Sequence, residues 1–370
     1  MRIALIGPYA DPEKGAAVVR INSFRESFSA AGHEVLILAP ARGVAAAAGV
    51  TRYRGILHLL SLLRRARPDV ILGTSPPITH NAFVAVQCAM TRTPFVLDAK
   101  DPFSYLVARF AHLRKGRFKT AGYKACEWIA HRLAAHIFVL TPLDKKNLLA
   151  CYGLPAEKVT VIRNGSDPRV IRPLPAAGRT VRAALKVPPS AKILVYAGVI
   201  GGKDLDVMLD ALASLLAKKA YLLFLFTHDG SAHADRMHAH VREAVARLSL
   251  EKRVRVVVNT PYEKLAASLS AADLALSPVP DFWLSNLPTK VFDYLAADLP
   301  VVAKGPRGGS MDEFFRTYDV GTFSTTWEGF AAGVERELAH PHRRVRRVIE
   351  RHFSRPILNR RALKVLEGLA

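Results

Sequence analysis

Short runs of apolar or β-branched residues alternate along this chain with longer amphipathic stretches. A first series of predicted strands covers Ile3–Ile6, Glu34–Leu38, Asp69–Leu72, Phe95–Asp98, Ile137–Leu140 and Val159–Ile162. A second series covers Ile193–Ala197, Tyr221–Phe226, Arg253–Val258, Leu274–Ser277 and Val301–Ala303. Strands that alternate with helical patterns are typical of βαβ units and a parallel sheet. The sequence therefore predicts an α/β protein with two doubly wound, Rossmann-like domains.

A proline-rich stretch without strand character separates the two series. It runs from Pro173 to Pro189, and such composition is typical of a domain linker. We therefore expect an N-terminal domain over 1–172, a linker over 173–190 and a C-terminal domain over 191–350. A basic helix over 351–370 is expected to pack back on the N-terminal domain. Doubly wound domains bind ligands at the carboxyl ends of their strands, which predicts a cleft between the two domains.

The charge of the chain points to an anionic partner. Lys and Arg number 53 against 31 Asp and Glu, which gives a formal net charge of +22. Such a field attracts nucleic acid, acidic lipid headgroups or phosphorylated substrates. The three cysteines are widely spaced and odd in number, which argues against a disulfide framework or a zinc site and favours the cytoplasm. The apolar runs are too short to span a bilayer, and no secretion signal is expected.

Several familiar motifs are missing from the sequence. No Gly-x-Gly-x-x-Gly follows the first predicted strand, which disfavours a nicotinamide dinucleotide site. There is also no phosphate-binding Walker loop, no Gly-x-Ser-x-Gly elbow and no metal-ligand spacing among the histidines. The sequence thus predicts neither a bound metal nor a resident cofactor.

The most informative segment runs from Asn286 to Val302. Pro288 suits the first position of a helix, where the amides of Thr289 and Lys290 would face an anion. Lys290 and Asp293 are three residues apart and so share a helix face. A cation beside a carboxylate suits a nucleoside diphosphate, with charge for the phosphates and an acceptor for the ribose hydroxyls. The alternative is a capped amphipathic helix that carries a surface ion pair.

This segment resembles the "Pro-x-Lys-x-x-Glu-Tyr-x-Ala-x-Gly-x-Pro-Val" element of retaining nucleotide-sugar glycosyltransferases with the GT-B fold, of the family 4 type. Further matches follow in the family's order: Gly32-His33-Glu34-Val35, Asn164-Gly165 with Asp167, Tyr196-Ala197-Gly198 before Lys203-Asp204, and Ala271-Ala272-Asp273. Two more elements are similar to those of bacterial amino-sugar transferases that act on lipid-linked glycans: Ser75-Pro76-Pro77 and Lys100-Asp101-Pro102.

The resemblance implies a nucleoside diphosphate sugar as donor and retention at the anomeric carbon. It assigns donor binding to Gly15, Gly198, Lys203, Thr289, Lys290 and Asp293. In this assignment Asp293 binds the ribose, and Lys203 and Lys290 stabilise the charge of the departing diphosphate. The group transferred would be a hexosyl or N-acetylhexosaminyl unit. No Asp-x-Asp pair is present, so an essential metal is not implied.

The acceptor is expected on the N-terminal domain. Asp101 and His80 follow predicted strands, where either could orient or deprotonate an acceptor hydroxyl, and we count both with Lys203 and Lys290 as candidate catalytic residues. Basic residues interleave with aromatic residues over 106–134, a pattern that suits a helix on an anionic bilayer. We therefore expect a glycan or lipid-linked glycan acceptor and peripheral attachment to the inner face of the cell membrane. The alternative is a solvated helix face around a core stripe.

The chain departs from the family pattern at three positions. Ser285 stands where the family commonly has its first Glu, Val199 where many members have Arg, and Asp298 near the position of a Gly. These departures leave the donor preference open. Two rival functions are a sugar-nucleotide epimerase of the same fold and a nucleic-acid-binding protein, although no motif that reads nucleic acid is present.

Overall fold

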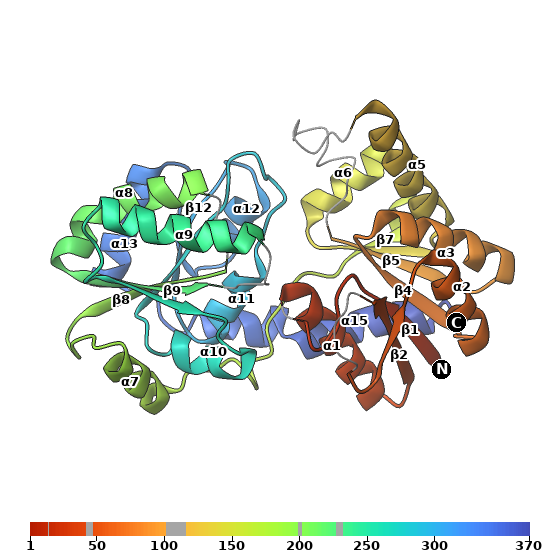
Figure 1. Cartoon of the computed structure of the whole chain (residues 1–370), viewed down its shortest axis with the longest axis horizontal. Helices are drawn as coiled ribbons and strands as arrows, with labels where there is room; N and C mark the ends of the chain where they lie inside the picture. The colour runs from red at the N-terminus through yellow and green to blue at the C-terminus, as the bar shows by residue number, and fades with distance from the viewer. Residues whose placement is uncertain (14, 42–46, 101–115, 199–201, 227–231) are drawn as a thin grey trace. The chain divides into compact units, whose positions relative to one another are not determined.

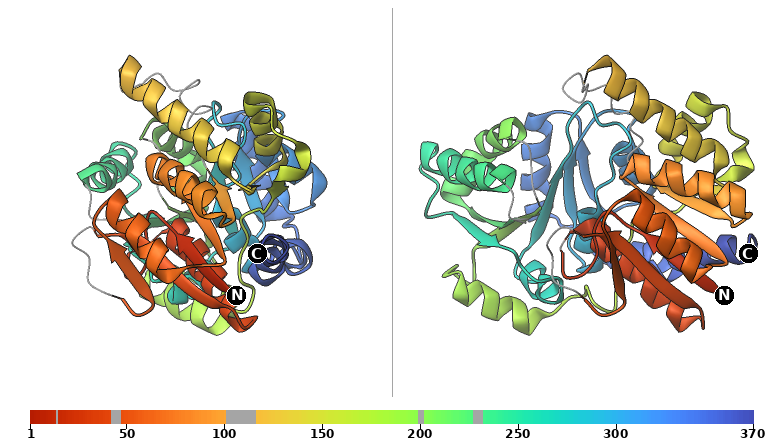
Figure 2. Two further views of the ribbon diagram at one scale, coloured as in Figure 1. Left: turned by 90° about the vertical axis from the view of Figure 1, so that its right-hand side faces the viewer. Right: turned by 45° about the vertical axis from the view of Figure 1, so that its right-hand side comes forward.

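The computed structural model describes residues 1–13, 15–41, 47–100, 116–198, 202–226 and 232–370 (Figure 1). They form two compact units: unit 1 comprises Met1–Arg163 and Arg355–Ala370, and unit 2 comprises Asn164–Ser354. Each unit is a parallel sheet with helices on both faces (Figure 2). The predicted fold of two Rossmann-like domains is confirmed.

Unit 1 contains a seven-stranded parallel sheet in the order β3-β2-β1-β4-β5-β6-β7. Its strands are β1 (Arg2–Ile6), β2 (Glu34–Pro40), β3 (Val50–Tyr53), β4 (Val70–Ser75), β5 (Phe95–Ala99), β6 (His136–Val139) and β7 (Val159–Val161). The central strands β4 and β5 are buried along their whole length, as expected for strands covered on both faces.

Helices cover the two faces of this sheet with separate apolar clusters. The described helices are α1 (Ala16–Ala30), α2 (Ile56–Ala66), α3 (Ile78–Thr91), α5 (Arg117–Leu133), α6 (Pro142–Tyr152), the short η2 (Ala156–Lys158) and α15 (Arg355–Glu367). Helices α2, α3, α5 and α6 contribute to one cluster, and α1 and α15 to the other. The alternation of inward and outward residues along each strand supplies both clusters.

Unit 2 contains a six-stranded parallel sheet in the order β10-β9-β8-β11-β12-β13. Its strands are β8 (Lys192–Ala197), β9 (Ala220–Phe226), β10 (Val254–Val258), β11 (Leu274–Pro278), β12 (Val301–Lys304) and β13 (Gly321–Ser324). Its described helices are α7 (Pro175–Ala184), α8 (Gly202–Lys218), α9 (Ala232–Arg247), α10 (Tyr262–Leu269), α11 (Thr289–Ala296), α12 (Ser310–Thr317), α13 (Trp327–Ala339), α14 (Arg346–Val348) and the π-helical η3 (Ile349–Phe353). Helices α8, α9 and α13 cover one face, and α10, α11 and α12 cover the other.

The sequence analysis did not predict two of the strands. Strands β3 and β13 each have four residues and stand at the edge of their sheet. Their sequences, Val-Thr-Arg-Tyr and Gly-Thr-Phe-Ser, contain too few apolar residues to give a strand pattern. Edge position explains this composition, because an edge strand is only partly covered.

The expected linker over 173–190 is instead part of unit 2. Pro175 begins helix α7, a position that suits proline. Helix α7 packs closely on α10, since a Cβ at Gly178 would lie 2.2 Å from the Ser270 carbonyl oxygen. Arg182 of α7 forms an ion pair with Asp273. The boundary between the units therefore lies earlier, at Arg163 and Asn164.

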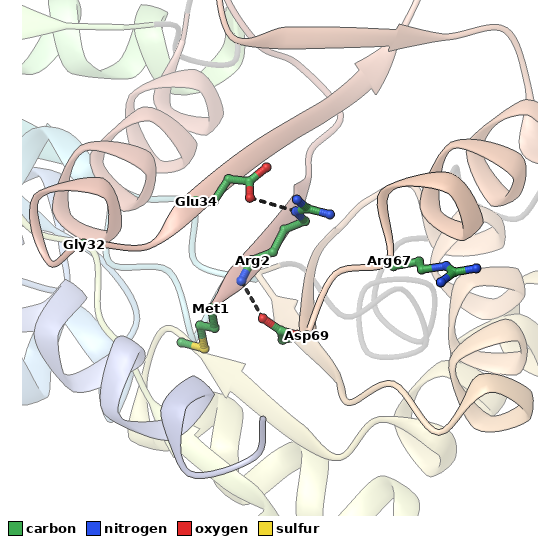
Figure 3. Close-up of a pocket in the computed structure, with 6 residues that line it drawn as sticks. All are labelled: Met1, Arg2, Gly32, Glu34, Arg67 and Asp69. Carbon is green, nitrogen blue, oxygen red and sulfur yellow. Dashed lines mark hydrogen bonds and ion pairs between the residues drawn. The ribbon is translucent and has the colours of Figure 1, made fainter.

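A shallow polar pocket lies at the amino ends of β1, β2 and β4 (Figure 3). The Nε of Arg2 is 2.9 Å from Glu34, and the Arg2 amide donates to Asp69 at 2.6 Å. These groups already bind one another. Since doubly wound sheets bind ligands at the opposite, carboxyl ends of their strands, we do not assign a substrate to this pocket.

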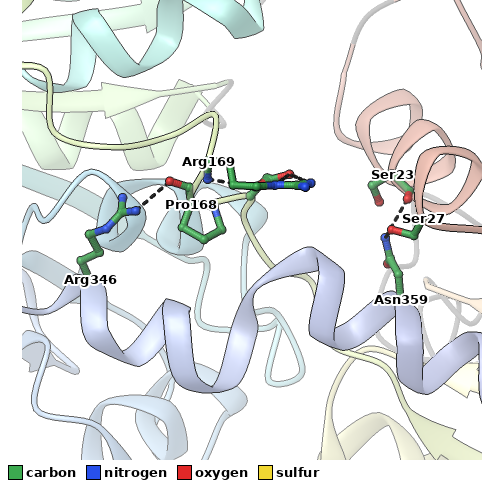
Figure 4. Close-up of polar contacts among 7 residues, drawn as sticks. Ser23, Ser27, Pro168, Arg169, Arg346 and Asn359 are labelled. Carbon is green, nitrogen blue, oxygen red and sulfur yellow. Dashed lines mark hydrogen bonds and ion pairs between the residues drawn. The ribbon is translucent and has the colours of Figure 1, made fainter. Parts of the chain in front are cut away.

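The chain leaves unit 1 after Arg163 and returns to it at Arg355. Within unit 2, the Ser166 amide donates to the Phe353 carbonyl at 3.2 Å, which pairs the leaving and returning segments. The Arg346 guanidinium donates to the Pro168 carbonyl at 2.7 Å and holds the same segments together (Figure 4). Within unit 1, the Asn359 side chain donates to Ser23 and Ser27 and fixes α15 on α1 (Figure 4). The C-terminal segment therefore belongs partly to each unit: it is part of unit 2 up to Ser354 and part of unit 1 from Arg355.

Candidate functional site

The candidate donor site lies in unit 2, where β8 ends and α11 begins. Gly198 follows β8 with a φ of +103°, a backbone conformation that residues with a side chain rarely adopt. A Cβ there would lie 3.6 Å from Nζ of Lys290, which is ordinary van der Waals contact. The constraint on Gly198 is therefore its backbone conformation. The structure thus brings two of the predicted residues, Gly198 and Lys290, together.

Lys290 carries a half-buried ammonium group that is held over an aromatic ring. Its Nζ lies 3.8 Å from the centroid of the Tyr196 ring, a distance that permits a cation–π interaction. In the described part of the chain, no acidic side chain forms an ion pair with Lys290. Burial lowers the pKa of Lys290 to about 7, because the ammonium is partly removed from water. An anion that binds here would supply the missing counter-charge.

Two tyrosines shape the surroundings of Lys290, and neither was assigned a role from the sequence. Tyr196 is 1% exposed and supplies the ring below the ammonium. The Tyr294 hydroxyl accepts a hydrogen bond of 2.7 Å from the Ala197 amide, which fixes the chain just before Gly198. Burial raises the pKa of both tyrosines above the ordinary value of 10.0, so neither hydroxyl ionises at neutral pH or well above it. Tyr294 is four residues after Lys290 and so lies on the same helix face, which is the pattern that could have revealed it.

Asp293 has an environment different from the one expected. Its side chain is almost buried, and its Oδ1 accepts a hydrogen bond of 2.6 Å from the Ser166 hydroxyl. The Tyr262 hydroxyl lies 3.5 Å from the same oxygen. Lys290 and Asp293 form no ion pair, so the alternative of a surface ion pair does not describe this helix. The role of Asp293 toward a ribose stays a prediction.

Helix α11 begins one residue later than the sequence suggested. Thr289 is its first residue, and Pro288 holds the cap position with φ −63° and ψ 143°. This extended ψ places Pro288 outside the helix, while its fixed φ still leads into the first turn. The first amides of a helix have no partner within the helix. Thr289 and Lys290 therefore still stand at the positive end of α11.

Three of the predicted site residues, Gly15, His80 and Asp101, belong to the sequence of unit 1. Gly15 caps α1 with a φ of +119° and is exposed. His80 lies in the first turn of α3, where its Nδ1 is buried and, in the described part of the chain, lacks a hydrogen-bond partner. Burial lowers the pKa of His80, which keeps the imidazole neutral near pH 7. Asp101 lies outside the described residues. In unit 2, the side chain of Lys203 on α8 is also outside the description.

A buried ion pair in unit 1 was not anticipated. Asp98 on β5 is fully buried, and its two oxygens accept from Nη2 and Nε of Arg20 on α1 at 2.8 and 2.9 Å. Arg20 also donates to the Ile162 carbonyl at 3.2 Å, next to the point where the chain leaves the unit. This bidentate pair fixes the carboxyl end of β5, from which the segment containing Asp101 continues.

No group of His, Cys, Asp and Glu side chains suited to holding a metal ion occurs among the residues that the structure describes. Over the same residues, no helix is both long and apolar enough to cross a membrane.

Comparison with known families accounts for both units. Residues 17–170 match the model of Glycosyltransferase Family 4, and residues 191–339 match that of Glycosyl transferases group 1. The chain belongs to the family 4 type of glycosyltransferases. The two matched segments together cover most of this family 4 chain, in the order and at the positions that the motifs in the sequence suggested.

Curated relatives match only part of this family 4 chain. A D-inositol 3-phosphate glycosyltransferase of Thermobispora bispora is 30% identical over 155 residues, which are 40% of this chain and 35% of that protein. The amylovoran biosynthesis glycosyltransferase AmsK of Erwinia amylovora is 30% identical over 182 residues, 48% of this chain and 42% of that protein. The matches thus span less than half the length of these relatives.

Solved structures match the whole chain at low identity and show the fold. Sucrose-phosphate synthase of Thermosynechococcus elongatus gives a TM-score of 0.78 at 16% identity, covering 100% of this chain and 98% of the other. Anabaena HepE in complex with UDP-glucose gives 0.77 at 16% identity and covers 100% of both chains. A UDP-GlcNAc 2-epimerase of Methanocaldococcus jannaschii gives 0.60 at 11% identity, again covering 100% of both. All three are similar in fold to this chain, whose two Rossmann-like domains are those of the GT-B fold.

Proposed function

We propose that this family 4 chain transfers a glycosyl group from a nucleoside diphosphate sugar to a glycan acceptor, with retention at the anomeric carbon. The observation that carries the proposal is the half-buried ammonium of Lys290, which stands beside Gly198 at the positive end of α11 without an acidic partner among the described residues. A cation left unpaired in this way binds a ligand anion without first losing an internal ion pair.

The same geometry suggests how the reaction is assisted. Negative charge grows on the diphosphate as the bond between its oxygen and the anomeric carbon breaks. Lys290 and the first amides of α11 would stabilise that charge, and they are already in place before the donor binds. Lys203 would supply a second cation, and Asp293 would accept from the ribose hydroxyls. We expect this chemistry to need no further cofactor.

A uridine diphosphate sugar is the first donor to test. The structural neighbour HepE was crystallised with UDP-glucose and with UDP, which supports this choice. The sugar that we expect to be transferred is a hexosyl or N-acetylhexosaminyl unit. Val199 directly follows Gly198, and Ser285 lies four residues before Thr289 in the sequence, so we expect these departures to bear on which sugar is accepted.

The acceptor that we propose is a lipid-linked glycan at the inner face of the cell membrane. A relative named for amylovoran biosynthesis supports a polysaccharide product. The neutral imidazole of His80 could accept a hydrogen bond or a proton from an acceptor hydroxyl, and Asp101 is the second candidate. Nucleic acid is not an expected partner.

The experiment uses purified protein, a panel of UDP-, GDP- and dTDP-sugars, calorimetry and mass spectrometry of the products. The wild type should bind one donor class, and Lys290→Ala should lower turnover at least about a hundredfold. Lys252→Ala is the matched control, because Lys252 is an exposed lysine of unit 2 at the other end of its sheet. Unchanged donor affinity and turnover in Lys290→Ala would remove the assigned site.

The same experiment separates the transferase from its rival, an epimerase of the same fold. An epimerase converts the donor into its stereoisomer without an acceptor and leaves the nucleotide attached to the sugar. A transferase releases free nucleoside diphosphate, slowly to water and faster when an acceptor is present. Isomerised donor without released nucleotide would therefore favour the epimerase.

A further inference from the structure

The outer side of helix α3 is apolar, although it faces solvent. Phe83, Val86 and Met90 are 49%, 40% and 76% exposed and follow one another at spacings of three and four residues, so they form one row. Ala89 is exposed beside them. Helix α3 contains no Asp, Glu, Lys or Arg. A surface helix ordinarily has polar residues on its outer side, so this row is the reverse of the usual pattern.

Neighbouring helices extend this apolar surface. Helix α3 contacts α5 on one side and α2 on the other, and all three cover the same face of the unit 1 sheet (Figure 2). Leu57 on α2 is 84% exposed, and Phe118 and Trp128 on α5 are 95% and 52% exposed. Among the described residues, most of the large apolar side chains that are exposed belong to these three helices. We call the outer surface of α2, α3 and α5 the α3 face.

The exposed charges that flank this row are positive. Arg64 and Arg65 end helix α2, and the exposed cations of α5 include Lys119 and Lys124. Glu127 is the single acidic residue in the sequences of these helices, and it is buried and accepts a hydrogen bond from Tyr152. An apolar row between cations, with no exposed carboxylate on the three helices, is complementary to an extended anionic surface.

We propose that the α3 face docks on an anionic lipid bilayer, with the α3 row inserted among the headgroups and the cations on the lipid phosphates. Apolar and aromatic side chains flanked by Lys and Arg are what an interfacial helix requires. This proposal rests on the proposed function, because a lipid-linked acceptor must meet the protein at the membrane. His80 lies three residues before Phe83 and therefore on the same side of α3, so the row leads toward the acceptor-side candidate.

The basic and aromatic residues over 106–134 predicted attachment to the membrane by charge, and the structure adds an exposed apolar row on α3 to that prediction. Residues 106–115 lie outside the described residues, and the row on α3 was not predicted to be exposed. Charge alone would give binding that disappears in high salt, since salt screens surface charges within about 10 Å at 0.1 M. Insertion of apolar side chains is not screened, so part of the binding should survive high salt.

The first test measures co-sedimentation of the full chain with vesicles of phosphatidylcholine, with and without phosphatidylglycerol, over a range of salt concentrations. The triple variant Phe83→Ser, Val86→Ser and Met90→Ser should lower the partition coefficient at least tenfold at every salt concentration. The matched control replaces three similarly exposed apolar residues of unit 2 by Ser: Val170, Val258 and Phe282, which are 41%, 40% and 47% exposed. This control should bind within twofold of the wild type.

The second test separates the charges from the row. Replacing Arg64, Arg65 and Lys124 by Ser should weaken binding at low salt and flatten its dependence on salt. Replacing the exposed Arg343, Arg344 and Arg347 of unit 2 by Ser is the control, and it should leave both quantities within twofold of the wild type. Arg346 is kept, because its guanidinium holds the Pro168 and Ala296 carbonyls.

In either test, an equal loss of vesicle binding in the triple variant of the α3 face and in its unit 2 control would overturn the α3 face as the docking surface. So would equal binding to neutral and anionic vesicles, or no vesicle binding at all. Circular dichroism and urea midpoints establish that each variant is folded. Failure of the proposed function is distinguishable, because vesicle binding is measured without donor. Lys290→Ala should bind vesicles like the wild type, and the α3 triple variant should bind donor like the wild type.

Discussion

Donor binding should depend on pH through Lys290. In the free protein burial lowers the pKa of this lysine to about 7, so a large part of the protein carries a neutral amine at and above neutral pH. A diphosphate beside the ammonium favours the charged form and raises the pKa again. Binding at alkaline pH must therefore take up a proton. Proton uptake on binding means that the dissociation constant of the donor rises with pH.

The size of the effect follows from that pKa. Below pH 7 the lysine is charged before the donor arrives, and the dissociation constant is independent of this group. Above it, each further pH unit weakens binding up to about tenfold, so between about pH 6 and about pH 8.5 the dissociation constant should rise about 30-fold, which is about 2 kcal/mol. An exposed lysine near its ordinary pKa of 10.5 would give no such change.

Isothermal titration of UDP-glucose at several pH values, in buffers with different ionisation enthalpies, measures both the affinity and the protons taken up. The diphosphate of a nucleotide sugar has no proton to lose in this range, so the slope reports on the protein. Lys290→Met should bind weakly and without a pH slope, whereas Lys252→Ala should keep the slope of the wild type. A wild-type affinity that is flat from about pH 6 to about pH 8.5 would refute the argument.

The stability of the free protein should also depend on pH through Lys290. It should rise with pH over the range in which donor affinity falls. The unfolded chain holds a proton on Lys290 up to about pH 10.5, and the folded chain releases it near pH 7. The stability that this lysine contributes therefore rises with pH between those values and is lost as the pH falls through 7. Urea denaturation should find Lys290→Met more stable than the wild type at pH 7, with the difference shrinking toward pH 10. A variant less stable than the wild type at pH 7 would contradict the desolvation of Lys290.

Two further substitutions test the backbone and the core around the predicted sites. Gly198→Ala should destabilise unit 2 by about 1–3 kcal/mol and weaken donor binding, since alanine disfavours a φ of +103°, whereas Gly122→Ala in the middle of helix α5 should be neutral or stabilising. Asp98→Ala leaves the Arg20 guanidinium buried without its partner and should lower the free energy of unfolding by about 3–5 kcal/mol in urea titrations. Glu34→Ala, which removes an exposed ion pair of the same unit, should lower it by less than about 1 kcal/mol, and similar losses in both variants would mean that burial does not decide the strength of these pairs.

Much of the fold could be predicted because it depends on local patterns. Every strand that the sequence analysis proposed occurs in the structure, shifted at most by a few residues. Buried parallel strands are continuous apolar runs, and such runs are the most readable pattern in a sequence. The edge strands β3 and β13 lack them and were missed. The supposed linker was misplaced because proline both interrupts structure and begins helices, and composition alone does not distinguish the two at Pro175.

The candidate site was predictable to the extent that its residues are neighbours on one helix. Thr289, Lys290 and Asp293 were predicted from the spacing within α11 and from the resemblance. Spacing could not show that the Lys290 ammonium rests on the Tyr196 ring, which comes from a strand almost a hundred positions earlier in the chain. It could not show that Ser166 donates to Asp293 either, because that contact forms only after the chain has crossed between the units.

These distant contacts give the residues of α11 different chemistry, although the helix presents them one turn apart. Lys290 points to the carboxyl end of β8, where it is partly dehydrated and unpaired among the described residues, so its charge depends on pH and on an arriving anion. Asp293 points to the segment that leaves unit 1, where a hydroxyl already binds it. A motif specifies which groups are present at a helix end. The packing of β8 and the crossing segment against that end decides which group already has a partner: Asp293 accepts from Ser166, whereas Lys290 has no acidic partner among the described residues.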